Sequence, residues 1–98
     1  MISDFNSVFV SGKVLGGPVI GEGAQGRTVL LQLVGTEQFY QGDILKERKE
    51  MHQVVVFPPL AQQAALYNEG DQVVVQGALR YKEVTKVHII ANRLDKLA

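Results

Sequence analysis

The chain has 98 residues, enough for one domain with a single modest core and too few for two. Hydrophobic residues make up 46% and charged residues 20% of it, a balance typical of globular rather than disordered chains. Cysteine is absent, which excludes a disulfide framework and a thiolate metal site. No apolar run approaches the roughly 18 residues of a membrane span, and no leader pattern opens the sequence. We therefore expect one domain over residues 1–98, located in the cytoplasm, with no membrane partner.

Formal net charge is zero, which argues mildly against a nucleic-acid partner. The distribution is uneven, because residues 80–98 carry a net charge of +3. The basic residues of this segment are Arg80, Lys82, Lys86, Arg93 and Lys96. Two readings stay open: a basic stripe that contacts phosphates, or a strand with an ordinary solvated face.

The first predicted element is a strand over about residues 7–16, with Val8, Val10 and Gly12 on one face. A glycine in a strand interior suggests a sharp bend or a close approach of another backbone. Residues 16–26 are rich in glycine, and we expect a turn-rich connector there.

Three segments follow the connector. Residues 27–35 predict a second strand that is apolar enough to be buried on much of both faces. Residues 36–50 are polar and centred on Gly42-Asp43, which indicates a long exposed loop or the tip of a β-ribbon. Residues 51–57 predict a third strand.

Pro58 and Pro59 have no backbone N–H to donate, so they cannot continue a central strand, whereas proline suits the first turn of a helix. About ten residues of helix-forming composition follow, with Leu60, Ala64 and Tyr67 in one apolar stripe. We expect Gly70 to lie just past the end of this helix.

Two more strands are predicted, over residues 71–81 and 84–94. The order is then three strands, one short helix and two strands, which is the element order of the OB-fold. The predicted fold class is therefore all-β: a five-stranded OB-fold Greek-key barrel with one short helix between strands three and four.

Three motifs occur along the chain: N-x-V-F-V-x-G-x-V near the start, M-H-Q-V-V-V-F, and L-A-x-x-A-x-x-Y-x-x-G-D-Q-V-V-V-Q-G-A-L-R. They resemble the motifs of the bacterial single-stranded DNA-binding proteins, including short relatives such as the primosomal replication protein of the B type. The most specific part runs from Met51 to Arg80. The resemblance implies a bacterial protein associated with the nucleoid, or one encoded by a phage or plasmid.

The resemblance also implies how DNA is bound: bases stack on aromatic rings and Lys or Arg side chains follow the phosphates. The family's tryptophan after the second strand corresponds to Phe39, with Tyr40 adjacent, and its phenylalanine closing the third strand to Phe57. A further family tryptophan corresponds to Met51, and Tyr81 is the nearest candidate for the last one. The predicted phosphate contacts are Lys13, Arg27, Lys46, Arg48, Lys49, Arg80, Lys82 and Lys86.

Structural roles compete with these assignments. Phe39 and Tyr40 could anchor the loop on the barrel, and Phe57 could belong to the core. The basic residues between 46 and 49 alternate with glutamates, so a salt-bridged loop explains them nearly as well.

The two histidines, His52 and His88, lack the neighbouring residues of a metal or acid–base site. We therefore expect no enzyme activity, no cofactor and no metal. The resemblance places His52 at a subunit interface, and exposed strand edges favour a homodimer or homotetramer formed through His52, Val8 and Val10.

The predicted function is non-sequence-specific binding of single-stranded DNA (ssDNA) in replication, recombination or repair, with replication or repair proteins as further candidate partners. Two alternatives stay open. One is a protein-interaction adaptor of a replication-restart primosome, in which DNA binding is secondary. The other is an OB module for RNA or oligosaccharide, since the fold alone does not determine the ligand.

Overall fold

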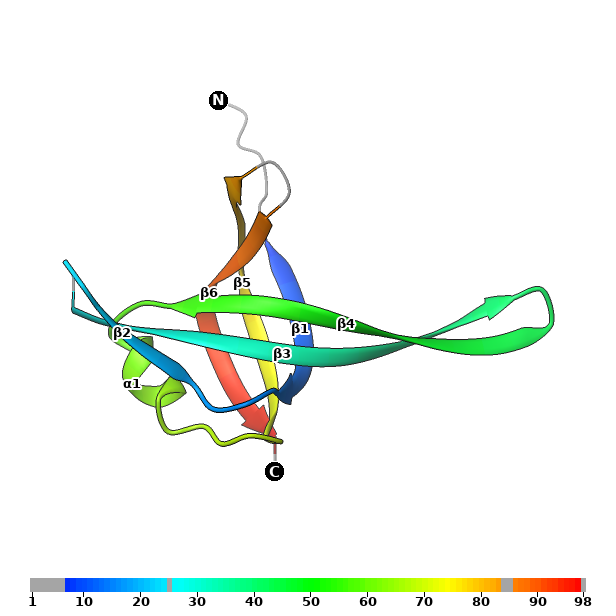
Figure 1. Cartoon of the computed structure of the whole chain (residues 1–98), viewed down its shortest axis with the longest axis horizontal. Helices are drawn as coiled ribbons and strands as arrows, with labels where there is room; N and C mark the ends of the chain where they lie inside the picture. The colour runs from blue at the N-terminus through cyan, green and yellow to red at the C-terminus, as the bar shows by residue number, and fades with distance from the viewer. Residues whose placement is uncertain (1–6, 25, 84–85, 98) are drawn as a thin grey trace.

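The structure, a computed structural model, describes residues 7–24, 26–83 and 86–97, without the side chains of 81–83 and 86. It contains the strands and helix labelled in Figure 1. They are β1 (Val8–Val14), β2 (Val19–Gly23), β3 (Gly26–Gln41), β4 (Ile44–Val56), α1 (Leu60–Ala64), β5 (Gln72–Glu83) and β6 (Lys86–Leu97).

Five of the strands form a closed ring. Their hydrogen-bonded order is β1-β5-β6-β4-β3, and β1 pairs again with β3 to close it. Neighbours are antiparallel, except that β4 and β6 are parallel. In Figure 1, β3 and β4 run across the view while β1, β5 and β6 cross them. This arrangement confirms the predicted OB-fold barrel.

The glycine-rich connector was predicted wrongly, because it contains β2. This strand pairs with the start of β3, from Val19 opposite Leu30 to Gly23 opposite Gly26, and lies outside the ring. Every residue of β2 is exposed. The strand therefore forms through hydrogen bonds to β3 rather than through burial, which a hydrophobic pattern does not reveal.

Alternating side chains build the core. Leu31 and Leu33 of β3, Val54 of β4 and Val73 and Val75 of β5 have no exposed surface. Because successive strand side chains point to opposite faces, the odd positions of β3 and the even positions of β4 face inward. The intervening positions of both strands form the outer face of the barrel.

Gly12 is where β1 meets β3. A Cβ atom at this position would lie 2.8 Å from the carbonyl oxygen of Val34. Lys13 and Val14 pair with Val34 and Leu33 directly afterwards. The predicted close approach of backbones at Gly12 is confirmed, and it closes the barrel.

The helix is shorter than predicted. It ends at Ala64, and Gly70 lies beyond it with its N–H donating to the carbonyl of Val14. Ala61 and Ala64 supply the buried face, and Tyr67 is buried in the turn that follows. Burial raises the pKa of the Tyr67 hydroxyl, which accepts a 2.8 Å hydrogen bond from Gln63. The predicted stripe therefore exists, but it extends past the helix. Among the described residues, no helix is long and apolar enough to cross a membrane.

Beyond the barrel, β3 and β4 continue as a two-stranded arm that projects far from the other strands (Figure 1). We call this arm the ribbon; it comprises residues 35–41 and 44–50, joined by Gly42 and Asp43. Pairing is continuous from Val29 opposite Val56 to Gln41 opposite Ile44. The ribbon alternative for residues 36–50 is thus confirmed.

Candidate nucleic-acid interface

The outer face of β3 and β4 is the candidate site, because these two strands of an OB-fold carry the usual ligand surface. Register fixes which side chains share it. From the ribbon tip inward, the pairs are Tyr40 with Leu45, Gln38 with Glu47, Thr36 with Lys49, Val34 with Met51, Gln32 with Gln53, and Leu30 with Val55.

Exposed large side chains stand at three places along this face. Tyr40 is 73% exposed beside Leu45 at 52%, Met51 is 57% exposed, and Phe57 is 42% exposed. Phe57 follows β4 directly, at the outward position after Val55, so it does not belong to the core. At about 3.3 Å per residue, the distance from the Tyr40 pair to Phe57 is roughly 40 Å. These side chains are well separated, so they offer distinct contact points rather than one cluster.

Two lysines flank Met51. Lys13 of β1 lies opposite Val34, the residue that pairs with Met51, and Lys49 is two residues from Met51 along β4. Both are exposed, and neither forms an ion pair with any residue the structure describes. Unpaired ammonium groups beside exposed apolar side chains suit a nucleic-acid strand, because its phosphates can contact the ammonium groups and its bases the apolar side chains.

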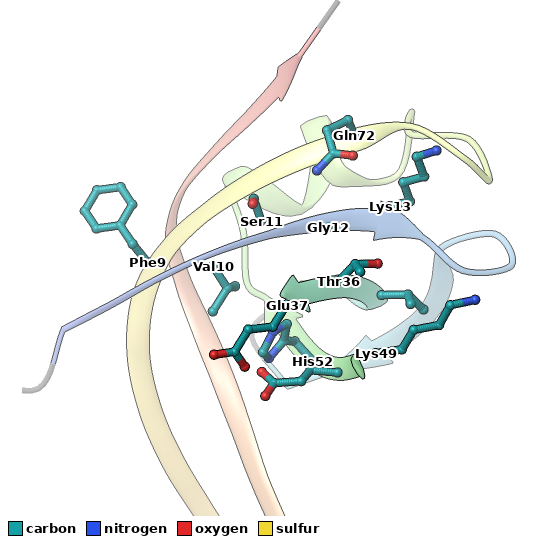
Figure 2. Close-up of a pocket in the computed structure, with 13 residues that line it drawn as sticks. Phe9, Val10, Ser11, Gly12, Lys13, Thr36, Glu37, Lys49, His52 and Gln72 are labelled. Carbon is teal, nitrogen blue, oxygen red and sulfur yellow. The ribbon is translucent and has the colours of Figure 1, made fainter. Parts of the chain in front are cut away.

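Both lysines line a hollow of about 740 Å³ between β1 and the base of the ribbon. Figure 2 shows Lys13 and Lys49 on one side of it and Glu37 and His52 on another. The hollow thus has a basic and an acidic side, and its basic side continues the outer face.

Phe39 and Tyr40 do not act together, because adjacent strand residues point to opposite faces. Phe39 lies on the inner face of the ribbon, which we define as Glu37, Phe39, Gln41, Ile44, Lys46, Arg48 and Glu50. The guanidinium carbon of Arg48 lies 5.3 Å from the centre of the half-buried Phe39 ring. This distance is within the range of a cation–π contact.

Arg48 is also held by two carboxylates. Its Nε and Nη2 donate to one oxygen of Glu37 at 3.0 and 2.8 Å, and its Nε lies 3.4 Å from Glu50. Hydrogen bonding to Arg48 and the charge of Arg48 lower the pKa of the Glu37 carboxyl. The salt-bridged alternative therefore describes Arg48 correctly, whereas Lys49 on the outer face is unpaired in the described structure.

The remaining predicted phosphate contacts are scattered. Arg27 lies at the start of β3 with its Nε 3.6 Å from Glu22, and Lys46 donates to Gln41 at 2.5 Å. Arg80 is exposed on β5, which is not adjacent to β3 or β4 in the ring. The side chains of Tyr81, Lys82 and Lys86 lie outside the described residues.

The predicted interface residues are partly brought together. Val10 and His52 both line the hollow, and Val8 and Val10 are half-buried against the core. Sequence reasoning gave no role to Phe9, which is 69% exposed and also lines the hollow. Phe9 alternates with Val8 and Val10 along β1, and this alternation already indicated from the sequence that its side chain points outward. Among the described residues, no group of three or more possible ligands could hold a metal ion.

Comparison with known proteins decides the family. The model of the single-strand binding protein family matches residues 5–93. The chain belongs to the single-strand binding protein family. Members of this family bind ssDNA and are not enzymes, which confirms that the chain is not an enzyme. No significant match is found among curated protein sequences.

Solved structures show the same fold. A single-stranded DNA-binding protein of Plasmodium falciparum, solved in complex with ssDNA, is 22% identical with a TM-score of 0.83, and the match covers 100% of this chain and 99% of that one. A small single-stranded DNA-binding protein of Streptomyces coelicolor is 25% identical with a TM-score of 0.80, covering 96% and 95%. The wild-type protein of Thermus aquaticus is 24% identical with a TM-score of 0.83, covering 96% of this chain and 50% of that one.

Proposed function

We propose that this member of the family binds ssDNA without sequence preference along the outer face of β3 and β4. Bases stack on Tyr40 and Phe57, Met51 supports the strand between them, and Lys13 and Lys49 contact phosphates. The observation that carries the proposal is the row of exposed Tyr40, Met51 and Phe57 beside Lys13 and Lys49, two lysines without an ion pair among the described residues. Such a protein would serve DNA replication, recombination or repair.

Stacking on rings tolerates every base, because each base has a π-face, and the lysines need only a phosphate. The chain has no tryptophan and a net charge of zero. We therefore expect each contact to be modest and the affinity to depend on several contacts at once. Site sizes of about 4–16 nucleotides per OB-fold are compatible with a path of roughly 40 Å.

A titration of the protein with dT oligomers, the matching duplex and the matching RNA at two salt concentrations tests this function. We expect dT oligomers to bind more tightly than duplex DNA. Equal binding to duplex and single strand would contradict the proposal, and tighter binding to RNA would favour the RNA-module alternative. No binding to any of the three would favour the protein adaptor.

Lys49→Ala should reduce the salt dependence of ssDNA binding. Each phosphate neutralised contributes about 0.7 to the slope of log affinity against log salt for single strands, so the slope should become shallower by about that amount. The matched control is Arg93→Ala on β6, which removes an exposed cation paired with Asp95 at 3.0 Å. If both variants keep the parent slope, Lys49 does not contact a phosphate.

We also propose that the protein forms a homodimer or homotetramer through β1. Over residues 8–12 one edge of β1 pairs with β5, and the described structure pairs its other edge with β3 only at Lys13 and Val14. Ser11 and Gly12 lie close to the backbone of β3, so the open part of this edge is residues 8–10, beside the half-buried His52, and it can accept a strand from a second copy.

Light scattering at micromolar concentration tests the assembly. One chain has a mass of 10.8 kDa, and we expect at least twice this value. A mass of 10.8 kDa across the concentration range would show that the β1 edge stays unpaired.

A further inference from the structure

The inner face of the ribbon carries the groups that could hold a nucleotide, but they already have intramolecular partners. Arg48 presents two N–H groups to Glu37 and lies over the ring of Phe39. Lys46 stands directly opposite Phe39 and donates to Gln41. Two neighbouring cross-strand pairs on one face therefore bring together an aromatic ring, a guanidinium group and an ammonium group.

The contact between Glu37 and Arg48 has the chemistry of a phosphate contact. A guanidinium group matches carboxylate and phosphate oxygens in the same way, through a planar set of N–H donors. The carboxylate of Glu37 therefore occupies the position on Arg48 that a phosphate oxygen would take. A glutamate carboxyl is charged at neutral pH, and Arg48 lowers the pKa of Glu37 further.

The ion pair is exposed enough to exchange. The side chains of Arg48 and Glu37 are 57% and 49% exposed. An exposed ion pair contributes little to stability, so opening it is easy for a competing anion. Glu50 approaches Arg48 less closely, at 3.4 Å, and would remain beside it.

We propose that Glu37 is a built-in competitor of DNA phosphate for Arg48. The proposal rests on the proposed ssDNA binding and adds a residue that sets its strength: a strand that reaches the inner face of the ribbon binds Arg48 only by displacing Glu37. Arg48 then turns from the carboxylate to the phosphate, and the Phe39 ring beneath it becomes available to a base. Glu37 thereby lowers the affinity of the ribbon for ssDNA.

Glu37→Gln tests this proposal, with Glu47→Gln as the matched control. Glu47 belongs to the same ribbon but to its outer face, where it accepts a hydrogen bond from Gln38 instead of pairing with Arg48. Each variant removes one negative charge from the ribbon. At low salt we expect Glu37→Gln to raise the affinity for a dT oligomer about 3- to 5-fold, the range of an exposed ion pair, and Glu47→Gln to raise it less.

The same pair of variants in an Arg48→Gln background completes the experiment. In that background, Glu37→Gln should raise the affinity for the dT oligomer no more than Glu47→Gln does, because the guanidinium group for which Glu37 and phosphate compete is absent. Equal gains in the parent background, or an excess that persists without Arg48, would overturn the proposal. A parent protein that does not bind the dT oligomer would instead refute the proposed function itself.

Discussion

Gly77→Ala is expected to lower the free energy of unfolding by about 1–3 kcal/mol or more, as overpacking does in a tight interior. A Cβ atom at Gly77 would overlap the carbonyl oxygen of Ile90 and lie 3.0 Å from the Cγ2 atom of Ile89. The obstacle is mainly backbone, which cannot rotate away as a flexible side chain can. The pairing of β5 with β6 shifts register between Gln76 and Gly77, so the glycine lies at an irregularity of this pairing.

Urea or thermal denaturation measures the effect, with Gly21→Ala in the exposed strand β2 as the control. Among the residues that the structure describes, none has an atom within 4 Å of a Cβ atom at Gly21, so this second substitution should leave the barrel intact. Equal stabilities of the two variants would show that β6 moves away from β5 without cost.

Tyr40→Ala and Phe57→Ala are each expected to reduce ssDNA affinity by about 1–3 kcal/mol, the usual contribution of a base–aromatic stack. The two sites are roughly 40 Å apart, so the double variant should lose about the sum. The loss should be similar at low and high salt, because no phosphate contact is removed. Fluorescence anisotropy with a labelled dT oligomer measures all three variants.

Leu66→Ala is the matched control for this series. Leu66 is 79% exposed and follows α1, so it belongs to neither β3 nor β4, and its removal should leave the affinity unchanged. A Tyr40 and Phe57 double variant that binds as the parent does would place the DNA on another surface.

Sequence pattern predicts the barrel well because its strands are apolar runs separated by turn residues and prolines, and their order around one short helix is that of the OB-fold. The alternation of buried positions such as Leu31, Leu33 and Val54 becomes clear only in the structure. It misses β2 because only Val19 and Ile20 of that strand are apolar and both are exposed. It overestimates the helix because the composition after Pro59 favours a helix up to Tyr67, whereas the chain turns after Ala64 to bury Tyr67 against the barrel.

The candidate site is harder to predict, because it depends on register. Phe39 and Tyr40 are adjacent in the sequence, and the pleat of β3 separates them onto opposite faces. The contact of Arg48 with Glu37 joins residues that become opposite only once the turn at Gly42 and Asp43 is placed. The row of Tyr40, Met51 and Phe57 likewise emerges only when the outward positions of β3 and β4 are read together.

Photo-crosslinking tests the proposed DNA path most directly. A dT oligomer that carries 5-iododeoxyuridine is irradiated with the protein, and the modified residues are identified by mass spectrometry. If ssDNA follows the outer face of β3 and β4, adducts are expected on Tyr40 and Phe57. Adducts found only on residues of β1, β5 or β6, such as the exposed Phe9, would contradict it.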